Sequence, residues 1–249
     1  MRFFIELSYN GSAYHGWQNQ PNAITVQEVL EKALSTLLNE NIAIVGAGRT
    51  DTGVHARQMF AHFDTAVKFV SEALVVKLNA FLPKDISIRN ISEVNADVHA
   101  RFDAKSRTYM YKVSCAKNPF SFDYSYYLKN KLDIEKMNEA AKILFDYTNF
   151  KCFSRSNSDV KTYNCDIMLA KWSAENDQLI FMIRADRFLR NMVRAIVGTM
   201  IEIGLNKMNL DQFRAIIESE DRSNAGPSAP AHALYLEDIE YDNTIYINE

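Results

Sequence analysis

The feature that most constrains this chain is a polar, glycine-rich stretch at residues 45–56, VGAGRTDTGVHA, which lies between two apolar runs. Three glycines within eight residues let the backbone take positive φ or approach a ligand closely. The flanking runs, residues 41–45 and 58–63, have the pattern of strands, so the stretch is predicted to be a strand-to-strand loop. Polar groups held on a loop by a rigid scaffold are typical of functional sites. We therefore place the candidate active site at Asp51, near the middle of this loop.

Composition indicates a soluble globular protein. Of 249 residues, 47% are apolar and 24% are charged, and this length can bury one sizeable core or two small ones. No apolar run approaches the roughly 18 residues of a membrane span, and the N-terminal run Phe3-Phe4-Ile5 is broken by Glu6. The three cysteines have no C-x-x-C spacing, which predicts a reduced compartment without a disulfide framework or a zinc site. We expect the protein to be cytoplasmic.

The first hundred residues carry strand and helix patterns in the order β-α-β-β-α-β. Thr25 and Glu28 form a predicted capping box, and apolar residues follow at helical spacing to Leu38. Ser71 is predicted to cap a second helix, which Pro83 ends. Strands are predicted at residues 2–9, 41–45, 58–63 and 86–94. This order is the split βαβ pattern, in which an antiparallel sheet carries two helices on one face.

The second part of the chain has a similar outline. Strands are predicted at residues 106–115, 124–128, 163–172, 179–185 and 233–241, and helices at residues 133–145, 188–203 and 209–218. We therefore predict an α+β fold of two halves with antiparallel or mixed sheets. The predicted domains are residues 1–98, which carry the Asp51 loop, and residues 99–249.

The net charge of -3 argues mildly against a nucleic-acid partner, but the basic residues are concentrated in two clusters. The clusters are Arg184, Arg187, Arg190 and Arg194, and Arg101, Lys105, Arg107 and Lys112. Such a cluster is either a binding face or a solvated surface. Trp17 lies on a glycine-containing loop with amide and imidazole groups, where it can stack on a base or serve as a packing anchor.

Most familiar catalytic motifs are absent. The chain has no P-loop, its glycines do not complete a dinucleotide fingerprint, and its five histidines include no H-x-x-x-H pair. Asp51-Thr52-Gly53 matches the aspartic-protease triplet, but the chain has no second copy, and Arg49-Thr50 stand where an apolar strand is needed. We therefore predict chemistry led by a carboxylate, with neither cofactor nor metal.

An Asp51 nucleophile or base must stay ionised in its cleft, which requires a cationic partner or hydrogen bonds to the carboxylate. Arginine suits this role because it stays charged when desolvated and can bind a carboxylate with two hydrogen bonds. The chain offers Arg49, two residues away, and Arg194 on the predicted helix 188–203. Spacing alone leaves open that Asp51 is a turn-forming residue.

Several blocks of the chain, taken in order, match the pattern of one family. Residues 48–56, GRTDTGVHA, are similar to a G-R-T-D-A-G-V-H-A signature. The other blocks are residues 9–20 (YNGSAYHGWQNQ), 61–63 (AHF), 102–111 (FDAKSRTYMY), 188–194 (FLRNMVR) and 229–236, with Ala-Pro and Leu-x-Leu. Together they resemble the tRNA pseudouridine synthase I (TruA) family over nearly the whole chain.

The resemblance implies a pseudouridine-synthase-like fold, in which two α+β halves meet at a central RNA-binding cleft. It implies an isomerase that converts uridine to pseudouridine at positions 38, 39 and 40 of the tRNA anticodon stem-loop, without cofactor or metal. It also implies a homodimer that forms one RNA site across both subunits.

The resemblance further implies roles for single residues. Asp51 is the expected catalytic aspartate, with Arg194 as its ionic partner. Tyr109 is expected to stack on the uracil and to help remove its C5 proton, and Arg49 to fill the space left by the flipped nucleotide. RNA contacts are expected from Trp17, Arg49, Arg107, Tyr109 and Arg190.

Three residues depart from the family pattern: Thr52 stands for Ala, Met59 for Gln and Ala233 for Gly. They remove no chemical group assigned above, so they bear on substrate fit more than on reaction type. An alternative is a tRNA-binding relative without turnover, which needs only the basic clusters and the aromatic loop. The intact catalytic set favours catalysis over this alternative, and a protease is the third hypothesis.

Overall fold

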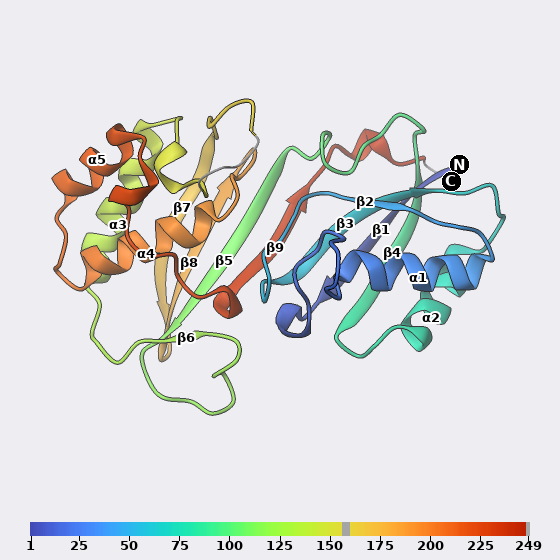
Figure 1. The fold of residues 1–249 in the computed structure, drawn as a ribbon, viewed down its shortest axis with the longest axis horizontal. Helices are drawn as coiled ribbons and strands as arrows, with labels where there is room; N and C mark the ends of the chain where they lie inside the picture. Colours follow the sequence, from blue (N-terminus) through green and yellow to red (C-terminus); the bar gives the residue numbers. More distant parts are fainter. Residues whose placement is uncertain (156–159, 248–249) are drawn as a thin grey trace. The chain divides into compact units, whose positions relative to one another are not determined.

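The computed structural model describes residues 1–155 and 160–247, which divide into two compact units (Figure 1). The first unit is Met1–Lys105 together with Tyr235–Glu249, and the second is Ser106–Leu234. In chain order, the second unit is therefore inserted between two parts of the first. The domain division at residues 98 and 99 stays a prediction.

The first unit is a mainly antiparallel sheet with two helices. Its elements are β1 (Arg2–Tyr9), α1 (Val26–Leu38), β2 (Ile44–Gly46), β3 (His55–Asp64), α2 (Ser71–Phe81), β4 (Ile86–Val94) and β9 (Leu234–Glu240). β1 pairs antiparallel with β3 and β4, and β2 pairs antiparallel with β3. α1 and α2 pack against each other, and α2 packs against β4. The predicted β-α-β-β-α-β order is confirmed.

Local sequence explains where these two helices begin. The Thr25 hydroxyl accepts a hydrogen bond from the Glu28 backbone N–H at 3.3 Å, so Thr25 is the N-cap of α1 as predicted. Ser71 is not the cap of α2, because it is the first helical residue. The N-cap is Val70, which has no side-chain oxygen to accept a hydrogen bond and makes no capping hydrogen bond.

The Asp51 loop is shorter than predicted because β3 begins at His55 and not at residue 58. β9 pairs in parallel with this start of β3, with His55 opposite Tyr235 and Ala56 opposite Leu236. The partner strand comes from the far end of the chain, so the local pattern contains no sign of it. The loop therefore spans residues 47–54.

The second unit is an antiparallel sheet with three α-helices among its described residues. Its elements are β5 (Ser106–Ser114), β6 (Tyr126–Tyr127), α3 (Ile134–Ile143), β7 (Ile167–Glu175), β8 (Gln178–Ala185), α4 (Met192–Gly204) and α5 (Leu210–Ser219). β8 pairs antiparallel with β5 and β7, and the short β6 lies parallel to β5. α3 packs against β7 and α4. The predicted α+β class is confirmed.

Some element ends in the second unit differ from the sequence prediction. α4 begins at Met192 and not at residue 188, because Asn191 has a φ of 66° and separates the helix from the preceding turn. β7 begins at Ile167 and not at residue 163, because Asn164 forms an isolated bridge with Asn149. Short 3-10 helices cover Gly11–Ala13, Leu144–Asp146, Lys151–Phe153, Arg222–Asn224, Ala231–Ala233 and Asn243–Ile245.

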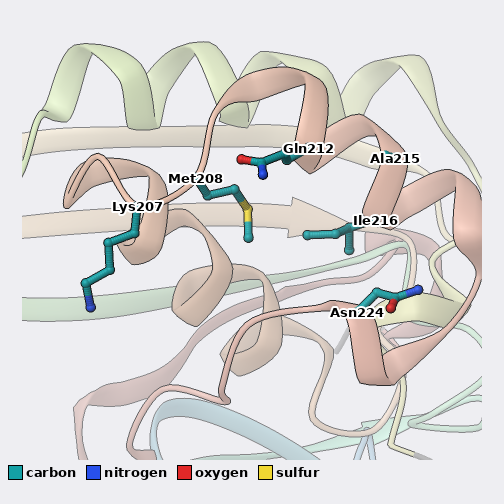
Figure 2. Close-up of a pocket in the computed structure, with 6 residues that line it drawn as sticks. All are labelled: Lys207, Met208, Gln212, Ala215, Ile216 and Asn224. Carbon is teal, nitrogen blue, oxygen red and sulfur yellow. The ribbon is translucent and has the colours of Figure 1, made fainter.

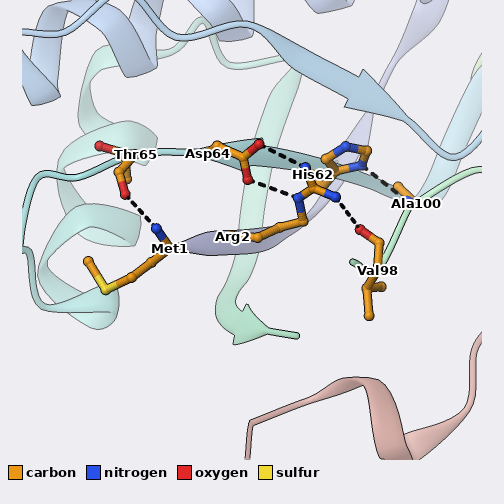
Figure 3. A network of polar contacts seen from close by, with 7 residues as sticks. All are labelled: Met1, Arg2, His62, Asp64, Thr65, Val98 and Ala100. Carbon is orange, nitrogen blue, oxygen red and sulfur yellow. Dashed lines mark hydrogen bonds and ion pairs between the residues drawn. The ribbon is translucent and has the colours of Figure 1, made fainter. Parts of the chain in front are cut away.

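A polar network joins the start of β1 to the end of β3 (Figure 3). Arg2 makes two hydrogen bonds of 2.8 Å to Asp64 and a third, of 2.9 Å, to the Val98 carbonyl. His62 is only 5% exposed, and its Nδ1 accepts a hydrogen bond from the Ala100 N–H at 3.1 Å. Burial, assisted by the charge of Arg2, lowers the pKa of His62 to about 4.

The buried, neutral His62 predicts a loss of stability at acidic pH. An unfolded histidine titrates near pH 6.5, so between this pH and about 4 the unfolded state binds more protons than the folded state. The free energy of unfolding should therefore fall as pH is lowered, by about 2 kcal/mol between pH 7.5 and 5 from this group alone. Urea denaturation measures this change. His62→Gln, which cannot titrate, should lose less stability over the same range, and equal losses would contradict the assignment.

Candidate functional site

The predicted site residues are distributed over both units. Trp17, Arg49 and Asp51 lie in the first unit, whereas the second contains Arg107, Tyr109, Arg190 and Arg194. The residues of each unit are therefore described separately.

In the first unit, the Asp51 loop joins β2 to β3, as the sequence predicts. The Ala47 N–H donates to the Phe60 carbonyl at 2.8 Å where the loop leaves β2. The Val54 N–H donates to the Asp51 carbonyl at 3.1 Å, which closes a turn that contains Gly53 at a φ of 78°. The side chain of Asp51 is half-buried and that of Arg49 is exposed. The loop thus carries a half-buried carboxylate two residues from an exposed guanidinium.

Residues 9–17 hold this loop through hydrogen bonds. The Trp17 N–H donates to the Thr50 carbonyl, and the Gly53 N–H donates to the Tyr14 carbonyl, both at 3.3 Å. The hydroxyls of Tyr9 and Thr50 lie 2.8 Å apart and share a buried hydrogen bond. Thr50 is therefore buried while its neighbour Asp51 is half-buried, and hydrogen bonds on both sides of Asp51 fix the backbone that carries it.

Two glycines allow the segment to approach this closely. A Cβ on Gly11 would lie 2.0 Å from the Val54 carbonyl oxygen, and one on Gly16 would lie 2.4 Å from the Thr50 carbonyl oxygen. Gly16 also has a φ of 86°, which residues with a side chain rarely adopt. The matched block at residues 9–20 is therefore a support for the Asp51 loop.

Trp17 takes the packing role that the sequence left open. Its ring is 1% exposed, lies 6.1 Å from the Tyr9 ring and covers Gly46 so closely that a Cβ there would be 2.4 Å from Trp17 Nε1. A base could reach this ring only if the packing opened. Trp17 is therefore not among the proposed RNA contacts.

In the second unit, Tyr109 and Arg107 lie two residues apart on β5, and so on the same face of the strand. The Tyr109 ring is half-buried and meets the Phe188 ring edge-on, with centroids 5.2 Å apart. Arg107 Nη1 donates to the Asp186 carbonyl at 2.8 Å. Both side chains thus contact the turn between β8 and α4, and these contacts restrain their conformations.

Arg194 lies on the first turn of α4, where residues 226–230 hold it. Its Nε donates to the Ala229 carbonyl at 2.7 Å, and the Ala229 N–H donates to the Arg194 carbonyl at 2.9 Å. A Cβ on Gly198, one turn later, would lie 1.7 Å from the Pro227 carbonyl oxygen. The matched Ala-Pro block therefore orients Arg194. Arg190, which precedes α4, is exposed.

A cavity lies in the first unit and another in the second. The first unit's cavity has a volume of about 310 Å³ and lies beside the Asp51 loop, with Arg49 in its wall. The second unit's cavity, of about 330 Å³, lies at α5, where Met208 and Ile216 point into the same space (Figure 2). The second cavity contains none of the predicted site residues, so only the first belongs to the candidate site.

Residues 1–155 and 160–247 contain neither a membrane-spanning helix nor a metal-binding group. No helix in these ranges is both long and apolar enough to cross a membrane. No group of three or more His, Cys, Asp or Glu side chains in them is arranged to hold a metal ion.

A family model described as tRNA pseudouridine synthase matches residues 7–103 and 140–242. The chain belongs to this family. The resemblance noted from the sequence blocks is therefore confirmed. Asp51 and Arg194 both lie within the segments that match the tRNA pseudouridine synthase model, whereas Tyr109 lies between them.

Full-length relatives agree with this family membership. Proteins called tRNA pseudouridine synthase A from Parabacteroides distasonis and Bacteroides thetaiotaomicron are 52% and 51% identical to the chain. The first alignment covers 98% of both chains, and the second covers 100% of this chain and 93% of the relative. A protein of the same name from Bacillus subtilis is 38% identical, over 98% of this chain and 100% of its own.

Sequence reasoning missed several residues of the candidate site. The sequence predicts a purely structural part for His55 and none for Tyr14. Both support the loop, since the Gly11 N–H donates to His55 Nδ1 at 3.1 Å and the Gly53 N–H donates to the Tyr14 carbonyl at 3.3 Å. His99 and Phe102 line the cavity beside Arg49, and Phe102 had been noted only as part of a family block. A phenylalanine between two charged residues, Arg101 and Asp103, was the sequence signal that could have singled out Phe102.

Gly46, at the end of β2, and Gly48, in the Asp51 loop, provide a matched test of the loop's packing. In Gly46→Ala the new methyl would meet the buried Trp17 ring, and overpacking of this kind costs about 1 to 3 kcal/mol. Gly48→Ala should cause no loss, because nothing lies within 4 Å of its Cβ position. Urea denaturation of both variants measures the difference. Equal stability of the two would show that Trp17 does not hold the loop.

Proposed function

We propose that this chain converts uridine to pseudouridine at positions 38, 39 and 40 of the tRNA anticodon stem-loop, with Asp51 as the nucleophile. As a member of its family, the chain is a tRNA pseudouridine synthase, an isomerase. The finer assignment rests on one observation above all. The backbone of the Asp51 loop is held by hydrogen bonds to residues 9–17, with Thr50 buried and Asp51 half-buried beside it.

The reaction is balanced without a cofactor. The N1–C1′ bond of uridine breaks, a C5–C1′ bond forms, C5 loses its proton and N1 gains one. No electrons are gained or lost overall, and no nucleotide is consumed. The protein must therefore supply a nucleophile to hold the detached intermediate, a surface on which the uracil turns, and a path for the C5 proton.

Asp51 supplies the nucleophile in this proposal, and Arg194 supplies the cation that keeps it ionised. Arg194 suits this because guanidinium stays charged when desolvated. Its Nε already donates to Ala229, so the pairing would use its terminal Nη atoms. The two hydrogen bonds between Arg194 and Ala229 favour one orientation of the guanidinium, and this lowers the entropic cost of the ion pair.

Tyr109 supplies the surface for the uracil, and its hydroxyl takes part in removing the C5 proton. Its edge contact with Phe188 restrains the ring, and the half-buried position leaves part of the ring accessible. A target in a stem must leave the base stack before it reacts, and Arg49 fills the space that it leaves. Arg107 and Arg190 contact the RNA backbone.

We further propose that the enzyme acts in the cytoplasm as a homodimer whose two subunits form one RNA site. A binding protein without turnover would need only the basic residues. The carboxylate of Asp51, on a loop braced by residues 9–17, argues against that alternative, because a carboxylate repels phosphate and adds nothing to RNA affinity.

Asp51→Asn tests the nucleophile, because it removes the charge at almost constant shape. We expect pseudouridine formation in unmodified tRNA transcripts to fall on the order of 10³-fold or more, while tRNA binding changes little. Wild type and variant are assayed with uridine at positions 38 to 40. Equal conversion by both would exclude Asp51, and binding without conversion by wild type would favour the tRNA-binding alternative.

Tyr109→Phe separates the ring from the hydroxyl. The variant keeps the ring and its contact with Phe188, so tRNA affinity should be retained while loss of the C5 proton slows on the order of 10²-fold. Tritium release from tRNA labelled at uridine C5 measures this step. Tyr109→Ala should lose affinity as well. A Phe variant as fast as wild type would show that the hydroxyl takes no part.

A further inference from the structure

The cavity beside the Asp51 loop is not explained by the roles assigned so far. Its volume is about 310 Å³, and all of its lining belongs to the first unit. It is lined by Gln18, Gln27, Ile44, Val45, Gly46, Gly48, Arg49, His99, Arg101 and Phe102. Asp51 is not among these residues. The cavity therefore adjoins the proposed catalytic carboxylate without containing it.

One wall of the cavity is an ordered turn at residues 99–103. The His99 N–H donates to the Asp103 carboxylate at 2.6 Å, and the Arg101 N–H donates to His99 Nδ1 at 3.1 Å. The Phe102 and Asp103 N–H groups both donate to the His99 carbonyl at 3.1 Å. The His99 ring lies edge-on to the buried His62, 4.8 Å away. The turn is thus anchored to the core.

This turn presents an aromatic ring at the surface. Phe102 is 73% exposed, although its ring is restrained by the His99 ring at 4.3 Å. The Arg101 guanidinium lies over the same ring, 5.7 Å from its centroid. An exposed aromatic ring beside arginines is the combination that binds single-stranded nucleic acid, because the ring stacks on a base and the cations attract phosphate.

The rest of the lining includes open space at one glycine. It includes Gly46 and Gly48, and a Cβ on Gly48 would meet nothing within 4 Å. The amides of Gln18 and Gln27 hydrogen-bond to each other at 2.9 Å, and Gln27 Nε2 donates to the Ile44 carbonyl at 3.0 Å, so the polar side of the cavity is ordered too. A volume near 300 Å³ is at the small end of ligand sites and suits one base better than several.

We propose that this cavity binds one unpaired nucleotide of the substrate RNA next to the target uridine, with its base on Phe102 and its phosphate near Arg101. The inference rests on the proposed function. Arg49 is two residues from Asp51, a distance of at most about 7 Å along the chain, so the bound nucleotide is a direct neighbour of the target. The site selects an unpaired nucleotide, because a base inside a duplex cannot offer its face to Phe102.

Phe102→Ala and Phe102→Trp test the stacking contact, with Phe81→Ala as the control. Phe81 is also an exposed aromatic residue of the first unit, at 48%, but it lies on α2 and outside the cavity. Phe102→Ala should raise the Kd and KM for tRNA on the order of tenfold with little change in kcat, whereas Phe102→Trp and Phe81→Ala should resemble wild type. Arg101→Ala should weaken binding and reduce its salt dependence.

An RNA with an abasic nucleotide beside the target completes a double-mutant cycle. If the base stacks on Phe102, wild type should lose affinity for the abasic RNA and Phe102→Ala should lose nothing more. Penalties that simply add, or a correctly folded Phe102→Ala with wild-type Kd and KM, would overturn the inference. Failure of the proposed function gives a different result, because wild type would then form no pseudouridine in the intact tRNA.

Discussion

Backbone-to-backbone packing between residues 9–17 and the Asp51 loop is the contact on which the candidate site depends. Gly11 and Gly16 place their Cα atoms where any side chain would collide with the carbonyls of Val54 and Thr50. The hydrogen bonds of this contact hold the loop backbone on both sides of Asp51. A nucleophile on such a loop loses little conformational entropy when substrate binds, because its freedom is already lost on folding.

The balance of charge is consistent with an RNA enzyme despite the net charge of -3. Part of the acidic end of the chain is engaged in ion pairs: Glu237 with Arg57 at 3.1 Å, and Asp242 with Lys105 at 2.7 Å. The Lys105 ammonium and nearby backbone hydrogen bonds lower the pKa of Asp242 to about 2. These carboxylates are thus locally balanced, and the net charge alone is a poor guide to what the surface binds.

The sequence predicted elements whose determinants are local. Helix α1 with its Thr25 cap, the β7 and β8 hairpin and the α+β class all follow from periodicity and turn residues. Where a distant segment decides, the prediction was wrong or incomplete. The early start of β3 depends on β9, from far along the chain. The late start of α4 has a local cause, the left-handed Asn191, which apolar periodicity does not reveal. The motif around Asp51 is continuous in the sequence, so Asp51 could be singled out. The packing of Trp17 on Gly46 and the cavity at Phe102 join distant segments, so they could not be predicted.

The route of the chain through the first unit has a consequence for its biosynthesis. β9 pairs with β3 directly after the Asp51 loop, and the Ile239 N–H donates to the Gln58 side chain at 2.9 Å. Farther on, the Asn95 N–H donates to the Ile245 carbonyl at 3.0 Å. When residues 1–100 have been made, β1 and β2 can already pair with β3, but the start of β3 at His55 and Ala56 stays unpaired on one side until β9 follows. During that interval the nascent chain exposes a strand edge, and a chaperone or the ribosome surface must keep it from pairing with another chain.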